Sequence, residues 1–316
     1  MKRVLVVHFS QSGQLTNIVR SICEPLRAST EIEVTFAELK PVKPYPFPWP
    51  FWKFFNIFPD AMYDDPDPIE PLQLPADADY DLIILGFQVW FLSPSMPMAA
   101  FLKTEQAKKL LAGKQVITAL CCRNMWLSAQ ERVKERLQEI GAHLIDHVAL
   151  VDRSPNAATL ISTPMWLLTG KRGPFLGGLV PVAGLTQEEI AATARFGHAI
   201  AAELPKREVS DHSPMFKGLG AVKIDVSLIA HEKLTGRSLL MWGKLLRACG
   251  NRESRLRKFV LGVYVVFLVV LLLTLMPVVL IIKKLLAPLM REKVEARRAY
   301  FAAPSGESED LVERSA

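Results

Sequence analysis

Strand-like and helix-like hydrophobic patterns alternate along residues 1–204. Residues 2–9 form an apolar run rich in β-branched side chains, and residues 14–28 carry apolar side chains at helical spacing. Further strands are predicted at 31–36, 80–87, 115–121 and 143–152, and further helices at 97–106, 128–140 and 186–204. This alternation predicts an α/β fold in which helices cover both faces of a parallel sheet. Five strands favour a doubly wound sheet in the order 2-1-3-4-5.

Two insertions interrupt the alternation, and both leave the sheet after a strand. The first insertion, residues 41–79, is rich in proline and in aromatic residues, namely Tyr45, Phe47, Trp49, Phe51, Trp52, Phe54, Phe55 and Phe58. The second insertion, residues 154–184, is apolar and contains four glycines. Because ligands of open α/β sheets bind at the carboxyl ends of the strands, the two insertions are expected to share a substrate pocket there. The alternative is that the aromatic residues form a satellite hydrophobic cluster.

The loop between the first strand and the first helix has the composition of a phosphate site. It consists of Ser10, Gln11, Ser12, Gly13, Gln14, Leu15 and Thr16. Hydroxyl groups, free backbone N–H groups and the positive end of a helix dipole would then converge on one small volume. The loop lacks the three glycines of the dinucleotide fingerprint and the lysine of a P-loop. An ordinary turn capped by Ser12 is the alternative.

A second loop at the end of the third predicted strand strengthens this interpretation. Gly86 is followed by Gln88, Val89, Trp90 and Phe91, then by serines and prolines, and then by the pair Phe101-Leu102. With the Ser-x-Ser-Gly loop, this arrangement resembles the flavodoxin-like superfamily, including its NAD(P)H-dependent FMN reductases. One departure is that flavodoxins commonly have Thr two places after the glycine, where this chain has Leu15. The resemblance implies that residues 10–16 hold the FMN phosphate and that residues 88–91 face the flavin ring.

A third loop, after the fourth predicted strand, is expected to face the flavin from the other side. Its candidate contacts are Cys122, Arg123, Asn124 and Trp126. Arg123 could place positive charge near the pyrimidine end of the ring, or it could pair with a surface carboxylate. Cys121 and Cys122 do not have the spacing of a metal site, so no metal is expected. The histidines form no recognisable catalytic pattern, and no catalytic residue is assigned.

The overall layout is also similar to the flavodoxin-like proteins that accompany dialkylresorcinol biosynthesis. That resemblance implies oxidation of an alkylated cyclohexanedione to a resorcinol. The sequence therefore predicts an FMN-dependent oxidoreductase that acts on a lipophilic small molecule, such as a quinone or an alkylated cyclic dione. NAD(P)H is the electron donor if the protein is a reductase. An electron-transfer protein without substrate chemistry of its own is the alternative.

The C-terminal third differs from the rest in charge and in hydropathy. The chain has 316 residues and a net charge of +6, and the basic excess lies in residues 205–316. Residues 205–258 form a basic amphipathic juxtamembrane segment, and residues 259–282 contain no charged side chain. A helix of this length would be about 36 Å long, and a bilayer core is about 30 Å thick. A transmembrane helix is therefore expected, with a buried core helix as the alternative, and residues 283–316 are expected to form a basic, then acidic, disordered tail.

These features predict a location and a set of partners. The chain begins without a signal peptide pattern, so the main domain is expected to face the cytoplasm from a single C-terminal anchor in the cytoplasmic membrane. Four cysteines without a disulfide framework favour reduced thiols. The expected partners are a lipophilic small molecule and membrane lipid, a homodimer is compatible with the sequence, and no nucleic acid is expected.

Overall fold

The computed structural model describes residues 1–75, 79–152, 154–286 and 291–313. Its centre is a six-stranded sheet. The strands are β1 (Lys2–His8), β2 (Ile32–Glu38), β3 (Leu82–Trp90), β4 (Ser93–Pro94), β5 (Gln115–Cys122) and β6 (His143–Val151). Five strands run parallel in the order β2-β1-β3-β5-β6, and β4 pairs antiparallel with the end of β3. The sheet therefore has six strands, not the predicted five, because β3 folds back on itself after Trp90.

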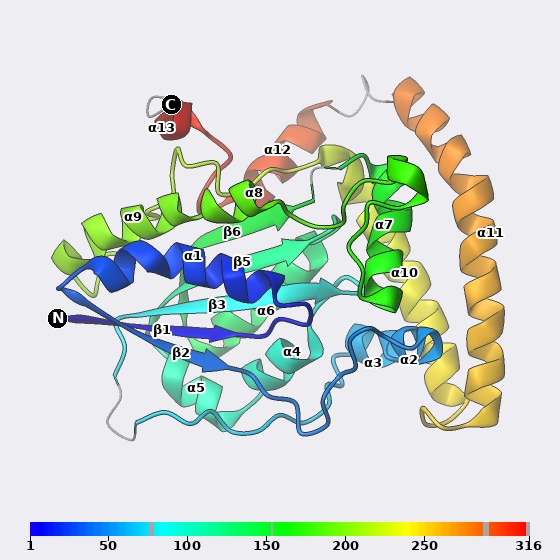
Figure 1. Cartoon of the computed structure of the whole chain (residues 1–316), viewed down its shortest axis with the longest axis horizontal. Coiled ribbons are helices and arrows are strands. Elements are labelled where there is room, and N and C mark those ends of the chain that lie inside the picture. Colours follow the sequence, from blue (N-terminus) through cyan, green and yellow to red (C-terminus); the bar gives the residue numbers. More distant parts are fainter. Residues whose placement is uncertain (76–78, 153, 287–290, 314–316) are drawn as a thin grey trace.

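Helices cover both faces of the sheet (Figure 1). One face carries α1 (Gln14–Ala28), α8 (Gln187–Ala191) and α9 (Ala194–Glu203), and the other carries α4 (Met96–Leu102), α5 (Glu105–Leu111) and α6 (Leu127–Ile140). The predicted helices 97–106 and 186–204 are each divided in two. The first divides where the Thr104 side chain accepts from the Ala107 N–H and starts α5. A short 3-10 helix, η2 (Leu204–Lys206), follows α9.

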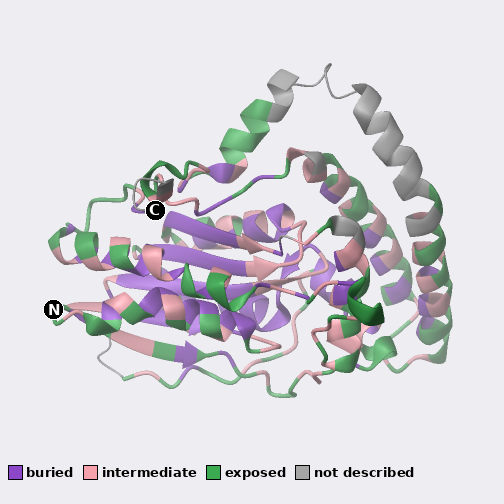
Figure 2. Cartoon of the chain, turned by 45° about the horizontal axis from the view of Figure 1, so that its top comes forward, coloured by how far each residue is buried: buried purple, intermediate pink, exposed green. Residues whose placement is uncertain are grey.

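The core lies between these layers, and Figure 2 shows the buried strands in purple. Val4, Leu5, Val6 and Val7 of β1 are completely buried, as their continuous apolar run implies for a central parallel strand. Residues 215–224, beyond the α/β alternation, also join this core, since Phe216 is buried within it.

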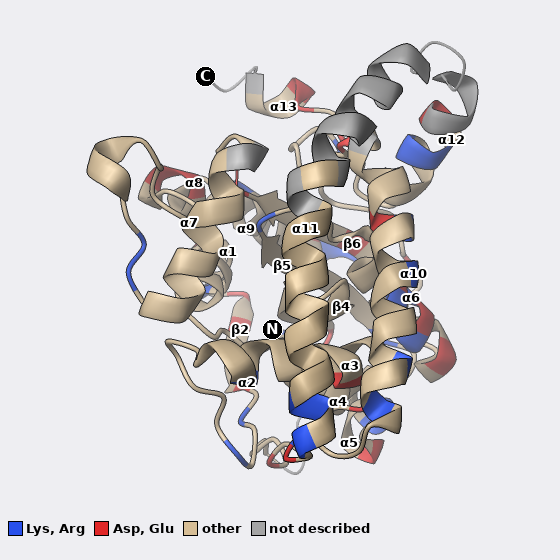
Figure 3. Cartoon of the chain, turned by 90° about the vertical axis from the view of Figure 1, so that its right-hand side faces the viewer, with Lys and Arg blue, Asp and Glu red and all other residues tan. Residues whose placement is uncertain are grey.

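The helices of the two insertions and those of residues 226–286 lie beyond the carboxyl ends of the strands (Figures 1 and 3). The aromatic insertion (residues 41–79) contains α2 (Phe51–Asn56) and α3 (Phe58–Met62). The second insertion (residues 154–184) contains α7 (Asn156–Thr169) and the short η1 (Leu176–Gly178). A helical hairpin of α10 (Val226–Ala248) and α11 (Arg255–Leu286) packs beside them.

The prediction of a transmembrane helix at 259–282, and with it a C-terminal anchor in the cytoplasmic membrane, is wrong. Across the described residues, no helix has both the length and the apolar character needed to cross a bilayer. The apolar side chains at the start of this run instead serve packing within the protein. Leu261 and Tyr264 are buried in a cluster with Phe58 of α3 and Leu246 of α10.

The described part of the predicted disordered tail, residues 283–316, is instead structured. It contains α12 (Arg291–Ala302) and a short α13 (Asp310–Glu313). Ser305 between them is buried, and its Oγ donates to Asp146 Oδ1 on β6 at 2.7 Å. The physical reason is that the buried Asp146 carboxylate needs hydrogen-bond donors, and the chain end supplies one.

Candidate functional site

The loop 10–16, hereafter the phosphate loop, joins β1 to the N-terminus of α1. Gly13 is the N-cap residue with φ +80°, and it makes no side-chain cap bond in the structure as described. A Cβ on Gly13 would meet no atom within 4 Å, so open space lies in front of the helix N-terminus. Ser12 and Thr16 are partly exposed beside it. The structure therefore presents a positively polarised helix end, whose N-cap residue has no side chain, with two hydroxyl groups nearby.

Other residues of the phosphate loop hold the loop itself in place. The Leu15 N–H donates to Ser10 Oγ at 3.2 Å, and the Leu15 side chain is completely buried. Gln14 is also buried, and its amide pairs with the backbone of Leu185 at 3.1 and 3.3 Å. Leu15 and Gln14 thus anchor the loop to the core and to the segment before α8.

The second loop is a tight β-hairpin. Gln88, Val89 and Trp90 belong to β3, and Trp90 pairs with Ser93 of β4. Phe91 and Leu92 form the turn, with φ of +50° and +60°. Positive φ at both central residues is characteristic of the type I′ turn, which matches the twist of a two-residue hairpin. Phe91 and Leu92 are strained in this conformation, which Gly and Asn adopt more easily.

The hairpin supports the first loop directly. The Gln11 N–H donates to Gln88 Oε1 at 2.8 Å, and Gln11 Nε2 donates to the Pro46 carbonyl at 2.9 Å. Gln11 Oε1 is buried without a hydrogen-bond partner among the described residues. Gly86 allows β3 to approach β1 closely, because a Cβ on residue 86 would lie 2.9 Å from the Cβ of His8.

The third loop follows β5, and the two cysteines at the end of this strand are half-buried. The Cys121 thiol donates to Gln14 Oε1 at 3.6 Å, which links this loop to the phosphate loop. Burial raises the pKa of Cys121 to about 12 and holds the pKa of Cys122 well above its ordinary value. Both thiols therefore stay protonated at neutral pH, and neither is a nucleophile or a metal ligand in this state.

Arg123 lies next in the third loop, partly buried, with Asn124 beside it. Burial lowers the pKa of its guanidinium, and the nearby Asp152 carboxylate raises it. Arg123 Nε has no hydrogen-bond partner, and no salt bridge to Arg123 occurs in the described ranges. The alternative that Arg123 pairs with a surface carboxylate is thus not supported, and the cation remains available to an anionic group at the site.

The two insertions meet each other above these loops. The Trp49 N–H donates to the Leu167 carbonyl at 2.7 Å, and the rings of Phe47 and Trp166 are 6.4 Å apart. Trp90 of the second loop packs edge to face against Tyr45 at 5.1 Å and Trp49 at 5.6 Å. The aromatic residues therefore pack against the second loop at the carboxyl edge, in clusters that are distinct from the main core.

Two residues near the site were missed by sequence reasoning. Arg172 of the second insertion donates to the Leu185 carbonyl at 2.6 Å, the same carbonyl that Gln14 binds. Glu232 of α10 accepts the N–H groups of Leu127 and Ser128 at the start of α6, and burial raises the pKa of its carboxyl. A cation in a glycine-rich segment was a weak signal for Arg172, whereas nothing in the sequence around Glu232 marked it as a cap of α6.

These residues fit an FMN group. The helix N-terminus at Gly13 and its hydroxyls suit a phosphate, the unpaired Gln11 Oε1 suits a hydroxyl donor, and the aromatic wall suits a flat apolar ring. Arg123 suits the polar edge of that ring, at which negative charge develops on reduction. Metal binding has no comparable basis, because the described residues contain no cluster of His, Cys, Asp and Glu suited to a metal ion.

Comparison with solved structures finds flavodoxin-like flavoproteins similar to this chain. A flavoprotein from Lactobacillus acidophilus NCFM, solved in complex with FMN, is 20% identical with a TM-score of 0.38 and matches 47% of this chain and 93% of that chain. A flavodoxin from the domain Archaea is 13% identical with a TM-score of 0.34, over 65% and 99% of the two chains. RosB with bound OHC-RP is 9% identical with a TM-score of 0.34, over 67% and 83%. Neither a family model nor a curated protein matches the sequence.

Proposed function

We propose that this protein is an FMN-dependent oxidoreductase that acts on a lipophilic small molecule. One observation carries the proposal, namely that hydrogen bonds join three loops at the carboxyl ends of β1, β3 and β5 around the N-terminus of α1. The bonds are those from Gln11 to Gln88 and from Cys121 to Gln14. This edge is where open α/β sheets bind their ligands.

Each loop has a separate task in this proposal. Ser12, Gly13 and Thr16 hold the phosphate through hydroxyl and backbone N–H groups. Trp90 and Phe91, held in the strained hairpin, give one side of the ring an apolar wall. When bound, the flavin supplies reversible transfer of electrons, and the protein orients it and excludes water.

The substrate class follows from the walls. Phe54 and Phe58 of the aromatic insertion pack against Phe91 at 4.9 and 5.8 Å, so the approach to the second loop is lined with aromatic rings. Such a surface favours binding of a hydrophobic quinone or an alkylated cyclic dione over binding of a charged metabolite. Anaerobic mixing with NAD(P)H would show by fast loss of flavin absorbance whether a nicotinamide is the electron donor.

The decisive experiment replaces Gly13 by Glu and measures FMN affinity. The new carboxylate would occupy the phosphate position and repel the phosphate, so we expect FMN affinity to fall at least about 100-fold. Gly141→Glu is the matched control, because Gly141 also has φ +80° and open space in front of its missing Cβ. Both variants carry the same backbone strain, but only Gly13 lies at the site. Equal FMN affinity in the two variants would refute the phosphate site.

A further inference from the structure

A cavity of about 770 Å³ opens next to the third loop. Asn124, Met125 and Trp126 form one wall, the end of β6 forms another, and the N-terminal parts of α8 and α10 complete it. None of its described lining residues belongs to the phosphate loop. The cavity is therefore a compartment separate from the proposed phosphate site and contiguous with the loop that flanks the proposed ring site.

The inner lining of the cavity is apolar. Trp126, Leu127, Ala149, Leu185 and Ile224 all line it and are all less than 9% exposed. A volume of this size and such walls match those of sites for drug-sized ligands, which span about 300–1,000 Å³. The cavity can accordingly take a ring system, which would gain free energy by leaving water.

The charged part of the lining is strongly acidic. Six carboxylates face two cations, the carboxylates being Asp152, Glu188, Glu189, Asp225, Glu232 and Glu309 and the cations Arg195 and Lys223. Arg195 already donates to the carbonyls of Leu219 and Ala192, at 2.8 and 2.6 Å. The net field inside the cavity is therefore negative, which attracts cations and repels anions.

Two of these carboxylates are buried rather than at the rim. Asp152 is 7% exposed and accepts the N–H groups of Ser154 and Gly184, at 2.9 and 2.8 Å. Glu232 is 2% exposed and accepts the backbone N–H groups of Leu127 and Ser128. Within the part of the chain that is described, neither forms a salt bridge. Asp152 has some compensation from the nearby Arg123 cation and Glu232 from the N-terminus of α6, and a cation that enters the cavity would add to it.

We propose that this cavity binds an arylalkylamine, with its ring against Trp126 and Leu127 and its ammonium group at Asp152 and Glu232. The geometry excludes a nicotinamide dinucleotide from this compartment, because its pyrophosphate would meet the carboxylates. The binding of the amine stands on the cavity alone. The role of this amine as a substrate for a bound flavin rests on the proposed function.

The test is calorimetric titration of the full-length protein with three probes that share a naphthalene ring. These probes are 2-(1-naphthyl)ethylamine, 2-(1-naphthyl)ethanol and 1-naphthylacetate. We expect the amine to bind at least 10-fold more tightly than the alcohol, and the acetate to bind most weakly. Glu232→Gln keeps the size and the acceptor oxygen of the side chain, so it should cost the amine about 10-fold and leave the alcohol unchanged. Glu253→Gln, at an exposed position outside the cavity, is the control.

Two results would overturn the proposal. One is that the acetate binds as tightly as the amine, and the other is that amine affinity is the same in the wild type and in Glu232→Gln. If Glu232→Gln does not fold, Asp152→Asn and the cavity-filling Leu228→Trp give the same test, with amine binding expected to fall in both.

The FMN content of each sample separates this proposal from the proposed function. Protein that retains no FMN but binds the amine through Glu232 would refute the flavin assignment and support the cavity. Protein that retains FMN but does not bind the amine would support the flavin assignment and refute the proposed amine site.

Discussion

Arg123 is the residue whose charge would most directly tune a bound flavin. It is partly buried at the end of β5, and no described carboxylate pairs with it. A cation there stabilises negative charge on the reduced ring, and each ~1.4 kcal/mol of that stabilisation raises a two-electron potential by about 30 mV.

We therefore expect Arg123→Gln to lower the reduction potential of the bound flavin by about 30 mV or more, since Coulomb energies at such sites are on the order of 1–4 kcal/mol. Equilibration with a reference dye measures the potential. Arg123→Lys, which keeps the charge, is the control and should retain most of the potential. An unchanged potential in Arg123→Gln would show that the guanidinium does not face the ring.

His147 predicts how stability depends on pH. Its side chain is completely buried on β6, and burial lowers its pKa to about 3 from an ordinary value of 6.5. Below pH 6.5 the unfolded chain takes up a proton at this position but the folded chain does not, so stability falls as the pH falls from 6.5 towards 3.

As the pH falls from 7 to 5, protonation of this histidine in the unfolded chain should lower the free energy of unfolding by about 2 kcal/mol. In His147→Leu the loss between these two pH values should be smaller by that amount, as measured by urea unfolding. Replacement of the exposed His198 by Leu is the control. An equally large loss in His147→Leu would place the acid sensitivity elsewhere.

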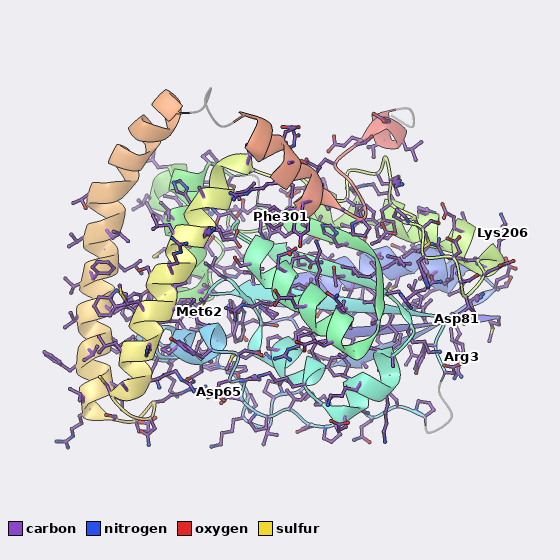
Figure 4. The ribbon with its side chains drawn as sticks, turned by 180° about the vertical axis from the view of Figure 1, so that it is seen from behind. Arg3, Met62, Asp65, Asp81, Lys206 and Phe301 are labelled. Carbon is purple, nitrogen blue, oxygen red and sulfur yellow. The ribbon has the colours of Figure 1, made fainter. Side chains whose placement is uncertain are left out.

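At the scale of elements, the helical hairpin is joined to the aromatic insertion by a buried ion cluster. Asp60 of α3 accepts from Arg247, Arg252 and Arg257 at 3.1, 2.7 and 3.2 Å. Figure 3 shows Lys and Arg gathered at the turn of the hairpin, and Figure 4 shows Met62 and Asp65 beside α10. The hairpin thereby holds the aromatic insertion against the second loop.

The same cluster reaches the proposed ring site. Arg252 also donates to Asp67 at 2.8 Å, and the Tyr45 hydroxyl donates to the same carboxylate at 2.8 Å. Tyr45 in turn packs against Trp90. A continuous set of contacts therefore runs from α11 to the aromatic wall.

Asp60→Asn should destabilise the protein by about 3 kcal/mol, because it leaves buried arginine charge without its carboxylate. Chemical denaturation measures the change. Asp65→Asn removes an exposed partner of the same Arg247 and should cost less than about 1 kcal/mol. Equal costs for the two variants would mean that burial of Asp60 contributes nothing to the cluster.

At the scale of the whole molecule, the chain returns to the sheet after the hairpin. Ser305 bridges Asp146 and His147, donating to the carboxylate at 2.7 Å and accepting the His147 N–H at 2.8 Å. Asp146 also accepts from the N–H of Met215 at 2.6 Å. The edge strand β6 is thus covered by segments far along the chain, which protects it from pairing with other molecules.

Ser305→Ala removes both bonds at once, and we expect a loss of about 1–3 kcal/mol in unfolding free energy, because two buried polar groups lose a partner. Ser308→Ala, at an exposed position nearby, should change stability by no more than about 0.5 kcal/mol. Indistinguishable denaturation curves for Ser305→Ala and wild type would show that the tail contributes nothing to the stability of the sheet.

The elements that could be predicted are those whose signals are local. The apolar run of β1, the helical spacing of α1 and the glycine after α6 lie within a few residues of what they determine. The candidate positions at the carboxyl ends of β1, β3 and β5 followed from the same patterns, because parallel strands end at one edge of the sheet. FMN contact by residues 10–16, 88–91 and 122–124 stays a prediction.

The features that could not be predicted depend on contacts between distant segments. Glu232 caps a helix about a hundred positions earlier in the chain, and the free charge of Arg123 depends on which carboxylates the fold brings near it. The error at 259–282 has the same cause. An apolar run shows by itself that a segment must avoid water, and this much the sequence determined. Only the tertiary structure decided what covers that segment, because Phe58 and Leu246 meet α11 through folding and not through proximity in the chain.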